Sequence, residues 1–81
     1  MDQAAIRSAV IAEIRRIAPE LEESELRPDK PLRDQIDLDS MDWLNFILAL
    51  HERFKIEIPE ADYAKLGTLQ ETIAYLASKQ A

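Results

Sequence analysis

Helically spaced apolar residues first appear near the start of the chain. The spacing predicts an amphipathic helix from about Gln3 to Ala18, with arginines among its polar positions. Asp2 can cap the start of this helix, and Pro19 marks its end because the residue before a proline is pushed out of the helical conformation. The apolar residues that recur every three or four positions are Ile6, Val10, Ile14 and Ile17.

A second helix is predicted from about Ser40 to Phe54, and it carries more apolar residues than one stripe can hold. Met41, Leu44 and Leu48 form a separate stripe, about 100° around the helix from parts of the main one. Two interpretations of this separate stripe stay open: burial in a crowded bundle, or exposure as a docking strip, since contiguous exposed apolar surface marks interaction sites. The main stripe, which suits a core, consists of Trp43, Phe46, Ile47, Leu50 and Phe54.

Residues 19–38 lie between these two helices and are predicted to form a long ordered loop. The segment contains three prolines and many charges, and a short helical turn fits within it. We expect Leu26, Leu32 and Ile36 to hold the loop against the core. A loop of this length is unusual in so small a chain, which indicates either a function or an undetected element.

The last third of the chain continues in helices. Residues 55–59 alternate as a short extended connection, and Pro59 can begin a brief helix that ends near Lys65. Thr68 and Glu71 have the spacing of a capping box, which predicts a final helix over about residues 69–79. Its inward-facing residues are expected to be Leu69, Ile73, Leu76 and Ala77.

The fold class that these elements predict is all-α. We expect a small bundle of three main helices plus one short helix, with a long loop between the first and second helices, in a single domain that spans residues 1–81. A chain of 81 residues can bury only a modest core, so an enclosed catalytic cleft is not expected.

Charge is concentrated in one third of the chain. Residues 19–45 hold nine acidic and three basic residues, whereas the remainder holds seven of each, so the whole net charge of −6 lies in this segment. Such a field repels nucleic acid and anionic membranes and attracts basic protein surfaces. A solvated acidic loop without a partner remains the alternative interpretation of the charge alone.

The residues needed for catalysis or metal binding are scarce. The chain has no cysteine, one glycine and one histidine, His51, for which a surface position is expected. Asp37 and Asp39 open like a calcium loop, but the places of its glycine and of its final acid hold Asp42 and Leu48. We therefore expect no metal site and no enzymatic activity.

Targeting signals are not visible in the sequence. The polar residues after Met1 do not form a signal peptide, and no apolar run approaches the roughly 20 residues that span a bilayer. We expect a soluble, cytoplasmic, monomeric protein that neither inserts into membranes nor binds nucleic acid.

Ser40 lies where the acidic segment meets the apolar second helix. If Asp39 is the N-cap, Ser40 is the first helical residue with a free hydroxyl, and Leu38 can pack on Trp43 as a hydrophobic staple. Asp42 then lies near the positive end of the helix dipole. If instead Ser40 is the cap, its oxygen is used to hold the helix start, and the sequence pattern alone favours this second assignment.

The triplet Asp39-Ser40-Met41 resembles the signature of the acyl carrier protein family, an Asp-Ser-Leu or Asp-Ser-Met sequence at the start of the second helix. The resemblance extends through the spacing to residues 50–54, the segment 56–59 and the ending 68–76, so it covers nearly the whole chain. The triplet alone is a weak signal, but the triplet together with this spacing is a strong one.

The resemblance implies that Ser40 is esterified by 4′-phosphopantetheine from coenzyme A. A separate phosphopantetheinyl transferase that uses magnesium would attach the group. The arm would then supply the thiol that this cysteine-free chain lacks. Under this resemblance Asp39 becomes the better cap, because Ser40 need not use its oxygen to hold the helix.

Carriers of this family present their second helix to partner enzymes with basic docking surfaces. Three departures from the usual fatty-acid-synthesis pattern suggest a specialised lipid or secondary-metabolite pathway with its own acyl-loading and acyl-transferring partners. Acidic residues are usual at three positions that here hold Asn45, His51 and Arg53. Asp37 occupies a position where glycine is usual, and Trp43 is bulkier than the usual residue. The residues that match the docking pattern are Asp39, Met41, Asp42, Leu44, Leu48 and Glu52.

The family's cargo commonly enters the apolar space between the helices. Trp43 and Phe46 could instead fill that space, which would leave the cargo exposed. Two rival functions stay open: an aminoacyl or peptidyl carrier that uses the same serine, and a helical interaction module in which Ser40 merely caps a helix. The residues expected to line an acyl cavity are Phe46, Ile47, Leu50, Ile58, Ala64 and Leu69.

Overall fold

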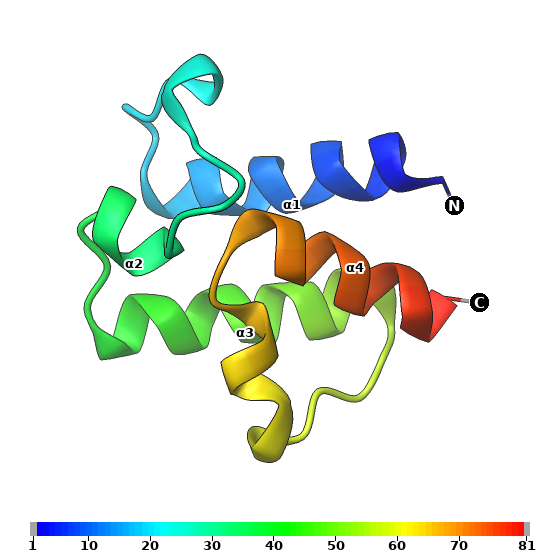
Figure 1. Ribbon diagram of the computed structural model, residues 1–81. Helices are drawn as coiled ribbons and strands as arrows, with labels where there is room; N and C mark the ends of the chain where they lie inside the picture. The colour runs from blue at the N-terminus through cyan, green and yellow to red at the C-terminus, as the bar shows by residue number, and fades with distance from the viewer. Residues whose placement is uncertain (1, 81) are drawn as a thin grey trace.

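Three long helices form the frame of the fold, and Figure 1 shows that α1 runs opposite to α3 and α4. The computed structural model describes residues 2–80, and within them the only strand-like pairing is an isolated bridge. The all-α prediction is confirmed. In chain order the elements are α1 (Gln3–Ile17), the 3₁₀ turn η1 (Glu23–Glu25), α2 (Leu32–Gln35), α3 (Ser40–Phe54), the 3₁₀ helix η2 (Glu60–Leu66) and α4 (Leu69–Gln80).

Helix α1 has the limits that its flanking residues predict. The Asp2 Oδ1 atom accepts a hydrogen bond from the backbone N–H of Ala5 at 2.8 Å, which makes Asp2 the N-cap. At the other end Ala18 is the C-cap, one residue before Pro19, and its N–H donates to the carbonyl of Ile14. The expected end is therefore correct to within one residue.

Helix α3 spans the predicted residues and buries the predicted face. Phe46, Ile47, Leu50 and Phe54 are buried, and Trp43 is half-buried. The helix ends at Lys55, which adopts the left-handed conformation and donates its N–H to the carbonyl of His51.

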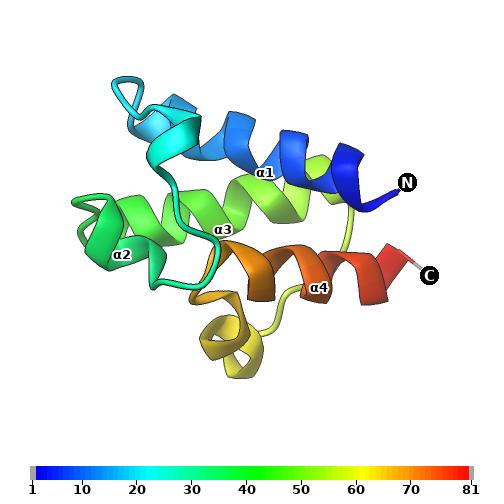
Figure 2. The same cartoon turned by 45° about the horizontal axis from the view of Figure 1, so that its top comes forward.

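The core lies where α1 packs against both α3 and α4, and the second view shows the three helices around it (Figure 2). Each helix contributes one apolar face, and the segment between α1 and α3 contributes further buried side chains. No helix within residues 2–80 combines the length and the apolar character needed to cross a membrane. The fully buried aliphatic residues are Ile6, Val10, Ile14, Leu32, Ile47, Leu50, Leu66, Leu69 and Leu76.

The segment between α1 and α3 is more structured than the predicted loop, because it contains η1 and α2. Backbone hydrogen bonds tie it to the start of α4: Leu32 donates to the carbonyl of Gly67 at 2.8 Å, and Gln70 donates to that of Pro28 at 3.0 Å. The side chains predicted to hold the loop are all buried. These are Leu26, Leu32 and Ile36.

A single amide side chain organises the turn that precedes α2. The Gln35 Oε1 atom accepts from the N–H of Arg27 at 2.6 Å, while its Nε2 atom donates to the carbonyls of Arg27 at 2.7 Å and Lys30 at 2.9 Å. Three backbone groups are thus satisfied inside the loop. The position of the following segment, which leads to Ser40, depends on this turn.

The C-terminal third follows the prediction except that α4 buries two residues which the pattern did not identify. The brief helix after Pro59 is a 3₁₀ helix, and α4 begins with the expected capping box, in which Thr68 and Glu71 each accept from the other's N–H. Ile73 and Ala77 are half-buried, whereas Thr72 and Tyr75, which the pattern did not identify, are buried. The buried Thr72 hydroxyl bonds to backbone carbonyls, which satisfies it.

Glu13 is a buried acid on the apolar face of α1. Only 4% of its side chain is exposed, and its two oxygens bind different arginines. Arg16 Nη1 donates to Oε1 at 3.2 Å, and Arg53 Nη1 donates to Oε2 at 2.6 Å. Since Arg53 belongs to α3, the second ion pair joins α1 to α3.

We predict that Glu13→Ala lowers the free energy of unfolding by about 1–2 kcal/mol, because packing and two charge-assisted bonds are lost while both arginines can turn to water. Urea denaturation measures the change. The exposed control Glu20→Ala should stay within about 0.5 kcal/mol of the parent protein. Equal losses in the two variants would contradict a specific role for Glu13.

Tyr75 on α4 is joined to η2 by a hydrogen bond. Its hydroxyl donates to Asp62 Oδ2 at 2.6 Å. Burial and this bond raise the pKa of Tyr75 to about 12 from an ordinary 10.0. The same bond, together with Lys65, holds the pKa of Asp62 below its ordinary 3.8.

The direction of each pKa shift determines the pH range over which the Tyr75–Asp62 pair stabilises the fold. The Tyr75 contribution is complete below pH 10.0 and is lost as the pH rises toward 12, and the Asp62 contribution is present above pH 3.8 and is lost in stronger acid. We predict that Asp62→Asn moves the pKa of Tyr75 from about 12 part of the way back to 10.0. A pH titration of tyrosinate absorbance measures the pKa of Tyr75, and the Tyr75→Phe variant identifies which part of the absorbance comes from Tyr75. An unchanged titration in Asp62→Asn would contradict the coupling between Asp62 and Tyr75.

Candidate functional site

The start of α3 is capped by Asp39, not by Ser40. The Asp39 Oδ1 atom accepts from the N–H of Asp42 at 2.8 Å, and the Asp39 carbonyl accepts from Trp43 at 3.0 Å. Ser40 is the first residue of the helix and is exposed. Of the two assignments that the sequence left open, the one that leaves the Ser40 hydroxyl outside the cap is correct.

The first turn of α3 suits an anion attached to Ser40. The N–H groups of Ser40 and Met41 precede the first intrahelical bond, so they have no helical carbonyl to bind, and the helix dipole adds positive potential there. Asp39 and Asp42 oppose this potential with negative charge. Because Ser40 is exposed, an attached group can extend into solvent away from these carboxylates. The geometry therefore fits a phosphodiester on the Ser40 oxygen.

The position of Ser40 is fixed by apolar side chains on both sides of it. Ile36 and Leu38 are buried in the core before the helix begins, while Asp37 between them is exposed. Trp43 packs against the same core, and its ring lies 5.4 Å from that of Phe46 at an angle of 34°. The serine is thus presented from a rigid helix end.

Three exposed apolar side chains continue from Ser40 along α3. Met41 is 66% exposed, Leu44 41% and Leu48 54%, and they are the exposed large hydrophobic residues of the described chain. Burial in a crowded bundle, the first of the two interpretations of this stripe, is wrong. We call these three residues the apolar strip.

The remaining residues of the expected docking set lie beside the apolar strip. Asp39 and Glu52 are exposed, and Asp42 is half-buried. Asp39 and Asp42 lie at the Ser40 end of the strip, and Glu52 lies one turn beyond Leu48. The surface beside Ser40 is therefore apolar and acidic.

The six residues expected to line an acyl cavity divide into two groups. Ala64 is exposed and lies with Lys65, Glu71, Ala74 and Tyr75 around an open hollow of about 400 Å³ between η2 and α4. The other five do not line that hollow. These core residues are Phe46, Ile47, Leu50, Ile58 and Leu69.

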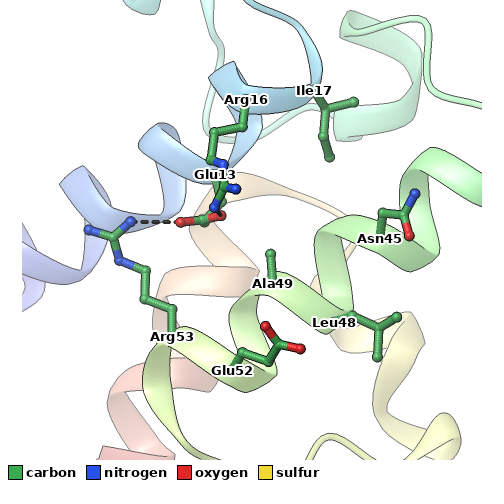
Figure 3. Close-up of a pocket in the computed structure, with 8 residues that line it drawn as sticks. All are labelled: Glu13, Arg16, Ile17, Asn45, Leu48, Ala49, Glu52 and Arg53. Carbon is green, nitrogen blue, oxygen red and sulfur yellow. Dashed lines mark hydrogen bonds and ion pairs between the residues drawn. The ribbon is translucent and has the colours of Figure 1, made fainter.

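A larger groove lies between α1 and α3, and the sequence analysis did not identify it. Its volume is about 690 Å³, and Figure 3 shows Ala49 on the side of α3 that faces α1. The sequence held one signal, because Glu13 follows Ile6 by seven positions and so shares the apolar face of α1. The lining residues are Glu13, Arg16, Ile17, Asn45, Leu48, Ala49, Glu52 and Arg53.

His51 is not the surface residue that was expected. It is half-buried, and its Nδ1 atom lies 2.5 Å from the carbonyl of Ile56, to which it must donate because a carbonyl only accepts. The histidine thus joins the end of α3 to the following connection. Within residues 2–80, no group of three or more histidine, cysteine or acidic side chains is arranged to hold a metal ion.

Comparison with known proteins gives one consistent result. Residues 8–76 match the family model described as a phosphopantetheine attachment site. An acyl carrier protein from Rubrobacter xylanophilus is 30% identical over 77 residues, which cover 91% of this chain and 95% of that protein. One from Chlorobium phaeovibrioides is 33% identical over 55 residues, which cover 68% of this chain and 70% of that protein.

A solved structure agrees with these sequences. The solution structure of a candidate acyl carrier protein from Anaplasma phagocytophilum superimposes with a TM-score of 0.82 at 30% identity. The match covers 94% of this chain and 89% of that one. The fold, the sequence and the serine at the helix start thus agree. The chain belongs to the acyl carrier protein family, whose members bear phosphopantetheine and act as carriers rather than enzymes.

Proposed function

We propose that this protein carries acyl groups as thioesters on a 4′-phosphopantetheine arm attached to Ser40. The observation that carries the proposal is the exposed Ser40 at the first position of α3, with Asp39 making the cap hydrogen bond in its place. Attachment joins the Ser40 oxygen to the phosphate of the pantetheine part of coenzyme A and releases the nucleotide part, while the serine proton is removed. A phosphopantetheinyl transferase is the partner for this step.

The arm supplies the chemistry that the chain lacks. The protein has no cysteine, so the terminal thiol of the arm is the group that can form a thioester with cargo. The chain's own residues hold the attachment point: Asp39 fixes the helix start, and Ile36 and Leu38 anchor the approach to it. The first-turn N–H groups of α3 favour the phosphate charge.

We propose that partner enzymes bind the surface that begins at Ser40. Exposed apolar side chains of this size lose unfavourable contact with water when a partner covers them, and nearby carboxylates attract basic side chains. The residues assigned to this docking surface are Asp39, Met41, Asp42, Leu44, Leu48 and Glu52.

We further propose that the carrier serves a specialised lipid or secondary-metabolite pathway. Asn45, His51 and Arg53 replace acids that the family pattern leads one to expect on α3. Asn45 and Arg53 line the groove beside the apolar strip. His51 makes a hydrogen bond to the carbonyl of Ile56, in the connection that follows α3. A partner that relies on a uniformly acidic α3 would therefore bind this chain weakly.

Five of the six proposed cavity residues are packed in the core, so cargo that reaches them must enter the core. We propose that an acyl chain inserts among Phe46, Ile47, Leu50, Ile58 and Leu69 by displacing their mutual contacts. Ala64 then borders the entrance from the exposed side of η2.

The attachment proposal predicts that the protein gains the mass of one phosphopantetheine when it is incubated with coenzyme A, magnesium and a promiscuous transferase. Intact-mass spectrometry measures the gain. Ser40→Ala should gain nothing, whereas the matched control Ser24→Ala, at another exposed serine between acids, should gain as much as the parent protein. No gain by the parent protein, or a gain by Ser40→Ala, would contradict the proposal.

The cargo proposal predicts that a long-chain acyl thioester on the protein hydrolyses more slowly than the same thioester on free phosphopantetheine. Phe46→Leu should change the hydrolysis rate because it alters the volume of the core, at a cost in stability of about 1–2 kcal/mol. The control Leu48→Ala, on the exposed strip, should leave it unchanged. Equal rates in the free and protein-bound thioesters would show that the cargo is exposed.

A further inference from the structure

The groove between α1 and α3 adjoins the far end of the apolar strip. Leu48 belongs to both, because it is 54% exposed and also lines the groove. Ala49 on α3 and Ile17 on α1, which are both half-buried, also line the groove. The small side chain of Ala49 leaves the space between the two helices open (Figure 3). A partner that covers the strip therefore reaches this groove as well.

The electrostatic character changes along this surface. Beside Ser40, Asp37, Asp39 and Asp42 lie within six positions that contain no base. At the groove, Arg16 and Arg53 are 76% and 45% exposed, and one acid, Glu52, is exposed beside them. The surface therefore has an acidic end at Ser40 and an arginine end at the groove.

Glu13 explains why the arginine end is fixed in place. It is 4% exposed, and each of its oxygens binds one guanidinium, so a partner cannot reach the carboxylate but can reach the arginines that it holds. A guanidinium has five N–H donors, and the bond to Glu13 uses one nitrogen of each arginine. The remaining donors suit an acidic side chain from another protein.

We propose that the docking surface is bipolar, and that the acyl-handling enzyme which covers its full length presents basic side chains near Ser40 and an acidic side chain over the arginines of the groove. An apolar side chain of that enzyme fills the space above Ala49. This inference rests on the proposed carrier function, because it concerns the partners that act on the Ser40-linked arm. It differs from docking on a uniformly basic partner, to which Arg16 and Arg53 would be repulsive.

Two helical peptides of about 20 residues, stapled so that they stay folded, serve as probes. Both carry the same leucines, and both carry lysines at one end. The bipolar peptide has glutamates at the other end, whereas the basic peptide has lysines there. Binding to the isotope-labelled protein is measured by NMR, which gives the affinity and shows whether the amides of Leu48, Ala49 and Arg53 shift.

We expect the bipolar peptide to bind about fivefold more tightly than the basic peptide at low salt. Arg16→Glu should lower the affinity for the bipolar peptide about fivefold, and Arg15→Glu less than about twofold. Arg15 is the matched control, because it is an exposed arginine on the same helix that does not line the groove. Arg16→Glu should keep its fold, since Glu13 still binds Arg53.

Equal affinity for the two peptides, or equal losses in Arg16→Glu and Arg15→Glu, would overturn the bipolar surface. Shifts confined to residues outside the groove would overturn it as well. Phosphopantetheine attachment is measured on the same three proteins. It should proceed in all of them because Arg15 and Arg16 belong to α1, whereas Ser40 and its cap Asp39 lie at the start of α3. If phosphopantetheine is attached normally but the two peptides bind with equal affinity, only the bipolar surface is refuted. If phosphopantetheine cannot be attached to the parent protein, the carrier function itself is refuted.

Discussion

The hydrogen bond from the N–H of Asp42 to the carboxylate of Asp39 is the contact on which the site depends. A helix start needs acceptors for its first N–H groups, and a serine at that boundary is commonly one of them. Because Asp39 provides the acceptor, Ser40 keeps its hydroxyl outside the cap while remaining on the rigid helix. An attachment point needs both properties at once, an unengaged oxygen and a fixed position.

The rest of the structure positions this helix start. The segment before it is held by Ile36 and Leu38 in the core, and that segment follows a turn that the Gln35 side chain closes. Backbone bonds from the loop to the start of α4 add a second attachment. The long connection between α1 and α3 thus supports the site.

Local signals explain how much of this could be predicted from the sequence. The helix limits at Asp2, Pro19 and Thr68 come from caps and a proline, whose effects are confined to a few neighbouring residues. The exposure of the apolar strip could not be decided, because periodicity shows that two stripes exist but not which one a neighbouring helix covers. The Gln35 turn and the Glu13 ion pair with Arg53 escaped prediction, since each joins residues that the fold alone brings together.

The division of labour between Asp39 and Ser40 is tested most directly by the free energy of unfolding of two alanine variants. Asp39→Ala removes the cap and should cost about 1 kcal/mol. Ser40→Ala should cost nothing measurable and can stabilise the helix slightly, because alanine is the better helix former at an exposed position. A loss in Ser40→Ala as large as that in Asp39→Ala would show that the serine oxygen holds the helix start, and would contradict the account.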